Sequence, residues 1–215
     1  KNLLNYMDKN KNIGIIGPKI LNTDGTLQLS TTAFPNLWFS FVRFLALDSI
    51  FVGSKLFNPR SKIFNEPNKI QDVEVLIGCF LLVRQASLEK VGLLDERFYI
   101  YSEDKDWSKR FGNAGFRIVY YPKSQAIHHM GGSSINAPYK FRKEYYKAYF
   151  LYLKKYHHPL EIRIFYLLIL LDKIIRILFV FFRFLVPSTH RKFNTLTQWK
   201  NDVKVFTWLL LKFRF

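Results

Sequence analysis

Residues 101–107 read Tyr-Ser-Glu-Asp-Lys-Asp-Trp, and the prediction of the fold is built around them. The stretch places three acids, Glu103, Asp104 and Asp106, in the first turn of a helix. We expect this helix to cover residues 103–113 and to end at Gly115, because glycine commonly terminates helices. Acids in the first turn of a helix can be interpreted in two ways. They can take part in a reaction, or they can simply offset the helix dipole, an interaction that stabilises the helix by about 0.3–1 kcal/mol.

The segments on both sides of this helix alternate between short strands and short helices. Ile13–Ile16 is apolar and reads as a strand that ends at Gly17, and Asn22–Gly25 is a strong hairpin turn signal. Val75–Val83 reads as one buried strand, although its Gly78 is unfavourable there unless something approaches the backbone closely. The pattern indicates an α/β domain.

Four further segments complete the expected order of elements. Ser87–Val91 is a short helix stopped by a glycine, and strands at 116–120 and 125–128 flank Pro122. Residues 36–70 are aromatic and irregular and read as an insertion. A helix rich in Lys and Tyr is expected over 140–156.

Charge is strongly positive and is concentrated towards the end of the chain. The net charge is +17, and residues 140–215 hold 16 Lys and Arg against 4 Asp and Glu. Such a balance is typical of proteins that meet nucleic acid, anionic lipid or phosphorylated ligands. No nucleic-acid motif is present, so we expect no nucleic-acid partner.

The C-terminal segment is amphipathic. From 163 to 186 the chain is nearly continuous in apolar residues, and its interior charges project within roughly 100° of each other on a helix. The uncharged runs are shorter than the ~18–20 residues that a spanning helix needs. A second basic, aromatic segment follows, with Trp199 and Phe206 at helical spacing. We expect helices that lie on an anionic membrane surface, the alternative being a helical pair packed on the domain or on a partner.

The cysteine content and the first residues of the chain indicate the cellular compartment. Cys79 is the single cysteine, which excludes a disulfide framework and cysteine-rich zinc patterns. The first residues lack the apolar block of a signal peptide, so exposure to the cytoplasm is the expectation. Together with the tail, this predicts a peripheral protein at the cytoplasmic face of the cell membrane.

An ordered set of motifs resembles the family 2 glycosyltransferases of the GT-A fold, in particular their rhamnosyltransferase-like members. The resemblance covers about residues 3–156 and is collinear. The matching stretches are Ile13–Lys19, Asp24–Gln28, Gly78–Arg84, Val91–Phe98, Glu103–Trp107, Arg110, Gly115 and His128–Ser133.

The resemblance implies a partial GT-A fold with a mixed sheet and a C-terminal amphipathic helical tail. The nucleotide-binding elements of this family, including an Asp-x-Asp motif, have no counterpart in these residues. We therefore expect residues 1–139 to be the acceptor-side half of the catalytic domain, 140–158 a basic, aromatic helix, and 159–215 membrane-associated helices.

The resemblance also assigns roles to the acids. A positioned carboxylate can take the proton of an acceptor hydroxyl, and the resemblance makes Asp104 this base, with Glu103 and Asp106 as its catalytic neighbours. Asp106 is expected to contact Arg110, which lies one helical turn later.

Substrate and metal roles follow from the same resemblance. Gly78 and Cys79 would border the acceptor site, and Gly131, Gly132 and Ser133 would wrap a phosphate with backbone amides. Arg84 and Arg110 would contact substrate, or alternatively brace the acid-bearing segment. His128 would be a ligand of Mn²⁺ or Mg²⁺, although a histidine at a strand end is often only a packing or capping residue.

The function implied is an inverting, metal-dependent transfer of a sugar from a nucleoside-diphosphate donor, dTDP-rhamnose-like or a UDP-sugar. The acceptor would be a cell-surface polysaccharide or a glycan on a polyprenyl carrier. Two alternatives remain open on the sequence: an inactive fragment of such an enzyme, and a non-catalytic protein of the membrane surface.

Overall fold

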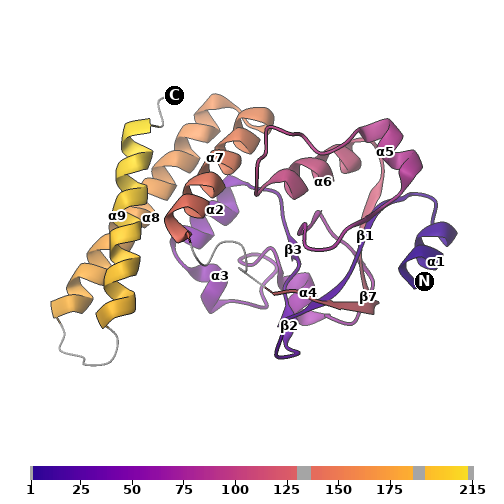
Figure 1. Ribbon diagram of the computed structural model, residues 1–215, viewed down its shortest axis with the longest axis horizontal. Coiled ribbons are helices and arrows are strands. Elements are labelled where there is room, and N and C mark those ends of the chain that lie inside the picture. Colours follow the sequence, from indigo (N-terminus) through magenta and orange to yellow (C-terminus); the bar gives the residue numbers. More distant parts are fainter. Residues whose placement is uncertain (1, 130–136, 186–191, 213–215) are drawn as a thin grey trace.

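The computed structural model describes residues 2–129, 137–185 and 192–212, and Figure 1 shows two parts at opposite ends of its long axis. A sheet flanked by short helices forms one end. Three long helices form the other: α7 (Pro138–Tyr156), α8 (Pro159–Leu185) and α9 (Lys192–Lys212). The expected α/β organisation with a C-terminal helical tail is confirmed.

Two long parallel strands form the centre of the sheet. β1 (Ile13–Leu21) pairs with β7 (Arg117–Ile127) along its whole length, with a register shift after Pro18. Three short strands add antiparallel partners: β2 (Leu27–Gln28) and β6 (Leu82–Val83) on β1, and β4 (Gln71–Asp72) on β7. The sheet is therefore mixed, as expected.

The predicted hairpin turn is present between β1 and β2. The amide of Asn22 donates to the carbonyl of Thr26 at 2.8 Å, and Gly25 takes a φ of +81°, which glycine adopts without steric cost. The pattern between Asn22 and Gly25 thus fixes the register of the first two strands.

The predicted strand over 75–83 is wrong. The segment splits into β5 (Val75–Leu76), which pairs with β3 (Thr31–Thr32), and β6, which pairs with β1. Between them the amide of Gly78 donates to the carboxylate of Asp104 in α6 (Glu103–Asn113), and the carbonyl of Phe80 lies 3.1 Å from where a Cβ of Gly17 would stand. The chain leaves the sheet because these contacts compete with strand pairing.

The two strands expected around Pro122 are one continuous strand, β7. It passes Pro122 because the register against β1 jumps there, from Pro18 opposite Tyr121 to Lys19 opposite Gln125. A proline in a strand is tolerated at such an irregularity, where no ladder hydrogen bond is lost.

Short helices cover the sheet and fill the insertion. α1 (Asn2–Lys9), α5 (Gln85–Val91) and α6 (Glu103–Asn113) lie beside the sheet, and α6 has the bounds expected from the sequence. The segment 36–70 contains α2 (Leu37–Phe44), α3 (Leu47–Ile50) and α4 (Ser61–Asn65). The insertion is thus partly helical, with Asn36 capping α2 by accepting from the amide of Phe39.

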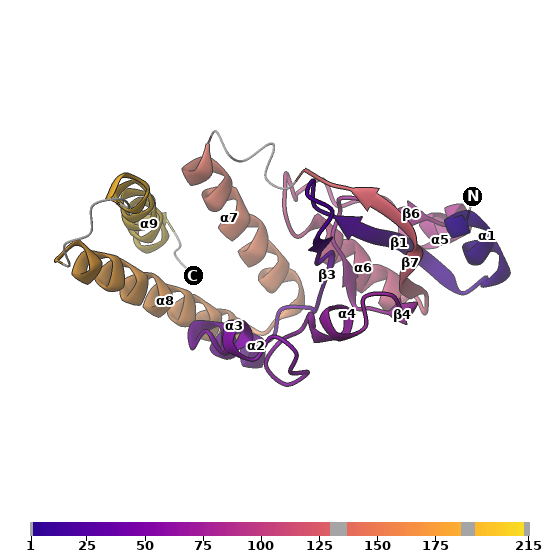
Figure 2. The ribbon, with the colours of Figure 1, turned by 90° about the horizontal axis from the view of Figure 1, so that it is seen from below.

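The helical end has its own core. Buried side chains of α7 pack against α8 and α9, and α2 lies beside α8 (Figure 2). The alternative in which the tail helices pack on the domain is therefore observed for their inner faces. The core residues are Phe150, Tyr152, Leu153, Phe165, Val205 and Leu209.

The outer face of α8 is apolar and exposed. Leu160, Ile164, Leu167, Leu171 and Leu178 recur at helical spacing and are each between 38% and 59% exposed. Across the described ranges, no helix combines the length and the apolar content that crossing a bilayer requires.

Candidate functional site: the start of α6

The chain enters α6 through two strained residues. Tyr101 and Ser102 have φ values of +68° and +62°, in the left-handed region that residues with a Cβ rarely occupy. Ser102 is also buried, and its hydroxyl has no hydrogen-bond partner among the described residues. Strain of this kind persists only where the surroundings enforce it, and it gathers at functional sites.

Asp104 lies at the junction of α6 with the loop after β5. It is 7% exposed, and its Oδ2 accepts a hydrogen bond from the amide of Gly78 at 3.2 Å. Its Oδ1 accepts from the amide of Lys105 at 2.7 Å, and the Lys105 ammonium lies 3.9 Å away. The structure therefore brings together Gly78 and Asp104, which the sequence analysis placed in one site.

Glu103 faces the same glycine. Its Oε1 would lie 3.6 Å from a Cβ on Gly78, and its buried Oε2 has no partner among the described residues. Burial, and then the nearby charge of Asp104, raise the pKa of the Glu103 carboxyl. Two carboxylates thus lie beside Gly78, and hydrogen bonds from backbone amides hold that of Asp104 in place.

Asp106 has a different environment. It is completely buried and accepts from Arg110 at 2.9 Å, from the Tyr156 hydroxyl at 2.7 Å and from the Lys155 ammonium at 2.6 Å. The expected contact with Arg110 is confirmed. Burial and the bond to Asp106 raise the pKa of Tyr156 to about 12. These contacts fasten α6 to α7, so the carboxylate of Asp106 is occupied by the protein itself.

The two predicted substrate arginines are also occupied. Arg110 donates to the carbonyls of Val91 and Leu93 at 2.8 and 2.7 Å, in addition to its bond with Asp106. Arg84 donates to the carbonyls of Ile13, Met7 and Asn10, which join α1 to β1. These are the contacts of braces, the alternative role considered for both residues.

Cys79 follows Gly78 and is half-buried. Its Sγ lies 3.6 Å from the carbonyl of Ile77, and burial raises the pKa of the thiol. The thiolate is therefore disfavoured, which makes this thiol a poor nucleophile. The glycine-rich loop residues Gly131, Gly132 and Ser133 lie outside the described residues.

His128 sits at the end of β7, and its amide donates to Leu21 at the end of β1. Its Nδ1 is 2.7 Å from Oε1 of Gln28, whose amide nitrogen donates to Asn22 and to the His128 carbonyl. Since Oε1 can only accept, Nδ1 is the donor in this contact, and in the neutral imidazole Nε2 then holds the lone pair. That arrangement suits a metal ligand whose ring is oriented by the side-chain amide of Gln28. In the described part of the chain, no three His, Cys, Asp or Glu side chains gather as a metal set.

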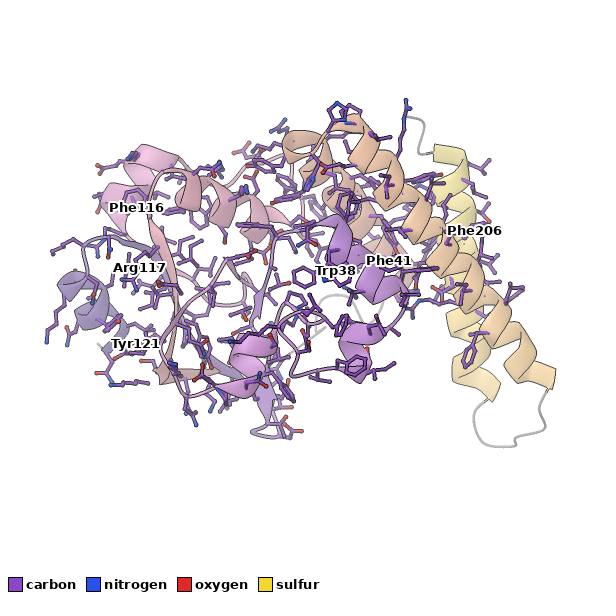
Figure 3. All side chains as sticks on the ribbon, turned by 180° about the vertical axis from the view of Figure 1, so that it is seen from behind. Trp38, Phe41, Phe116, Arg117, Tyr121 and Phe206 are labelled. Carbon is purple, nitrogen blue, oxygen red and sulfur yellow. The ribbon has the colours of Figure 1, made fainter. Side chains whose placement is uncertain are left out.

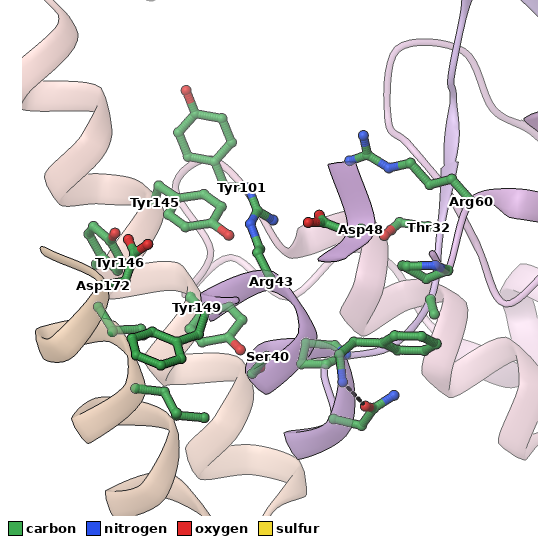
Figure 4. A pocket seen from close by; sticks show the side chains of 18 of the residues that line it. Thr32, Ser40, Arg43, Asp48, Arg60, Tyr101, Tyr145, Tyr146, Tyr149 and Asp172 are labelled. Atoms are coloured by element: carbon green, nitrogen blue, oxygen red, sulfur yellow. Dashed lines mark hydrogen bonds between the residues drawn. The ribbon is translucent and has the colours of Figure 1, made fainter. Parts of the chain in front are cut away.

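A cavity of about 990 Å³ lies between α2, α7 and α8, next to the start of α6 (Figure 4). Tyr101 and Lys105, the neighbours of Asp104, belong to its lining, together with Arg43 and Arg60 from the insertion. The sequence analysis missed both arginines. They stand in an aromatic, irregular segment, and no motif there signals a ligand.

Comparisons with known proteins agree with this arrangement of motifs. The chain is 30% identical over 148 residues to an N-acetylglucosaminyl-diphospho-decaprenol L-rhamnosyltransferase of Mycobacterium tuberculosis. The aligned region covers 67% of this chain and 46% of that protein. It is 31% identical over 83 residues to the rhamnosyltransferase WbbL of Escherichia coli K12, covering 39% of this chain and 31% of that protein. No family model matches the chain. The chain thus spans less than half the length of the curated relatives it matches.

Proposed function

We propose that this chain is the acceptor-side part of a family 2 glycosyltransferase with the GT-A fold. It would transfer a sugar, rhamnose or a related hexose, from a nucleoside-diphosphate donor to a glycan carried on a polyprenyl diphosphate. The carboxylate of Asp104, held by the amides of Gly78 and of Lys105, a residue of the cavity lining, is the observation that carries the proposal. The two named rhamnosyltransferases support the reaction class, and the first supports the kind of acceptor.

Asp104 acts as the base in this proposal. The acceptor oxygen forms a bond to the anomeric carbon from the side opposite the leaving group, so the configuration inverts. The bond from that carbon to the diphosphate oxygen breaks, and its electron pair leaves with the diphosphate. The hydroxyl proton passes to the carboxylate of Asp104, which the amide of Gly78 holds in place.

The proposal includes a divalent cation. His128 would contribute Nε2 as one ligand, because its Nδ1 is engaged by Gln28. Mn²⁺ or Mg²⁺ bound there would neutralise charge on the diphosphate of the donor. His128 can supply only one ligand, so carboxylates from elsewhere in the full-length protein must complete the set.

The experiment is sugar transfer by the full-length protein with Asp104→Asn. The expected result is a fall in kcat of about 10²–10⁴-fold, since a positioned base contributes that much, with the folded structure retained. Asp72→Asn is the matched control, because Asp72 is an exposed aspartate paired with Arg117 on the edge of the sheet. Unchanged turnover in the Asp104 variant would leave the non-catalytic alternative in its place.

Gly78→Ala gives an independent check on the same geometry. An added Cβ would meet Glu103 and Asp104 only at 3.6 and 3.8 Å, which is ordinary van der Waals contact. We therefore expect folding to be preserved while the methyl group narrows the space in front of Asp104 and lowers transfer. A variant that transfers sugar as fast as the wild type would place the acceptor elsewhere.

We also propose that the protein lies on the anionic, cytoplasmic surface of the cell membrane. The exposed apolar residues of α8 support this, and so do Trp38 and Phe41, which are exposed on α2 (Figure 3), and the exposed Leu45 that follows α2. The basic residues of 140–215 would add attraction to acidic lipid.

Flotation with phosphatidylglycerol vesicles tests the membrane proposal. Leu167→Ser with Leu171→Ser on α8 should lower the bound fraction. Leu4→Ser with Ile127→Ser is the control, because those side chains are equally exposed but lie at the sheet end. Equal losses in both double variants would contradict the proposal.

A further inference from the structure

The cavity beside α6 carries more positive than negative charge. Its lining includes six Lys and Arg side chains and three aspartates. Two of the aspartates are already engaged: Asp202 accepts from Arg142 at 2.6 Å, and Asp172 accepts from Arg176 at 2.8 Å. The remaining positive charge is therefore concentrated on the other side of the cavity.

Arg43 and Arg60 form that other side (Figure 4). Within the described ranges, neither guanidinium makes a hydrogen bond or an ion pair with another side chain. Asp48 is the remaining carboxylate of the lining, and it lies beyond ion-pair distance from both. Burial first, and then the like charge of Arg43, lower the pKa of Arg60, with Tyr145 and Asp48 partly offsetting them.

Arg60 is partly buried and has no ion-pair partner among the described residues, so its charge costs free energy in the empty protein, whereas Arg43 is exposed. The cost is relieved when an anion enters, because two guanidinium forks match the oxygens of phosphate groups in a bidentate manner. The same arrangement therefore lowers the stability of the empty protein and raises its affinity for an anion.

We propose that Arg43 and Arg60 bind the diphosphate of the lipid-linked acceptor. This inference rests on the proposed function, because it takes from it the class of the acceptor. The donor also contains a diphosphate, so the position of the cavity must decide between the two sources.

The surroundings of the cavity favour the lipid source. α2 turns Ser40 and Arg43 inward and exposes Trp38 and Phe41 outward beside α8 (Figures 3 and 4). The cavity is thus separated from an exposed apolar surface by a single helix. Apolar side chains also line its interior: Phe39, Phe44, Leu168 and Ile169.

Asp104, the proposed base, is not in the lining of the cavity, but residues close to it in the chain are. Lys105 and Tyr101 belong to the lining, and Lys105 contacts Asp104. A ligand anchored by its diphosphate at Arg43 and Arg60 would direct its isoprenoid chain towards the apolar surface. Its first sugar would then point towards Asp104, which is the order that the transfer requires.

Calorimetry on the full-length protein tests the proposal with four probes: inorganic pyrophosphate, geranyl diphosphate, UDP and dTDP. We expect geranyl diphosphate to bind about 10-fold more tightly than pyrophosphate, because apolar burial adds to the charge contact. Arg43→Ala with Arg60→Ala should weaken geranyl diphosphate binding by at least about 30-fold, because charge-assisted hydrogen bonds from guanidinium to phosphate are among the strongest that side chains make.

Three further variants sharpen the measurement. Arg176→Ala removes an arginine from the same cavity whose charge is already paired with Asp172, so affinity should stay within about twofold. Asp48→Asn removes the carboxylate nearest the two arginines and should tighten binding. Arg43→Lys with Arg60→Lys keeps the charge and the fold but loses the bidentate forks, so it should bind with intermediate affinity.

The outcomes separate this inference from the proposed function. Wild-type affinity in the double alanine variant overturns the inference, whatever the transfer assay gives. Tighter binding of UDP or dTDP than of geranyl diphosphate, lost in the same variant, assigns the cavity to the donor and also overturns it. Loss of geranyl diphosphate binding in that variant, with full transfer retained by Asp104→Asn, supports the binding site and removes the proposed base.

Discussion

The start of α6 and the cavity between α2 and α8 lie side by side, and their charged groups have opposite environments. Asp106 accepts from Arg110, Lys155 and Tyr156 within 2.9 Å. In the cavity, Arg43 and Arg60 have no such partners among the described residues. Paired charges hold elements together, whereas unpaired charges in a cavity are free to hold a ligand. Residues with paired charges therefore maintain the structure of this site, whereas the unpaired arginines would bind its ligand.

The largest effect is expected at Asp106. Asp106→Ala removes a completely buried carboxylate that joins Arg110, Lys155 and Tyr156, and Lys155 keeps its ion pair with Asp95. The loss should lower the free energy of unfolding by about 3–5 kcal/mol. Urea denaturation followed by circular dichroism measures this. Asp104→Ala is the matched comparison, because Asp104 is joined mainly to backbone amides, and it should cost about 1 kcal/mol. Equal losses at the two positions would erase the distinction between structural and functional acids.

The next effect compares a paired arginine with an unpaired one. Arg84→Ala leaves the carbonyls of Ile13, Met7 and Asn10 without their donor and should cost about 2–3 kcal/mol. Arg60→Ala removes a partly buried charge that has no described partner and should not lower the free energy of unfolding, because burial of that charge is unfavourable. The same denaturation assay applies, and a large loss for Arg60→Ala would show that this side chain is structural.

The sequence predicted the long helices and the local turns well, and its errors lie in the strands. The hairpin at Asn22–Gly25 and the bounds of α6 were found because turn residues and helix terminators act locally. The strand over 75–83 was wrong because the break at Gly78 depends on the carboxylate of Asp104, which lies 26 positions later in the chain. Local patterns do not report such a contact.

The candidate site shows the same division. Asp104 and Gly78 were predicted because they stand in ordered motifs, and Arg110 was paired correctly with Asp106 from helical spacing alone. The arginines of the cavity were missed because their proposed role depends on the lack of an ion-pair partner among the described residues. That property arises only when the insertion packs beside α7 and α8.

The smallest effect is expected from Glu103→Gln, and it concerns pH. Burial raises the pKa of Glu103 above its ordinary value of 4.5, so the folded state binds this proton more tightly than the unfolded state does. The wild type therefore loses stability as the pH rises from 4.5 through the folded-state pKa, whereas a glutamine does not titrate.

We expect the two proteins to have equal melting temperatures below pH 4.5 and to diverge above it, with the variant more stable. The gain should be about 1–2 °C at neutral pH, a small value because solvent reaches part of the carboxyl. Glu66→Gln is the control, since Glu66 is exposed and paired with Lys69, and it should show no such divergence. A variant that is less stable than the wild type at neutral pH would mean that the buried oxygen of Glu103 is ionised and held by a partner. Glu103 would then belong with Asp106 among the paired, structural acids.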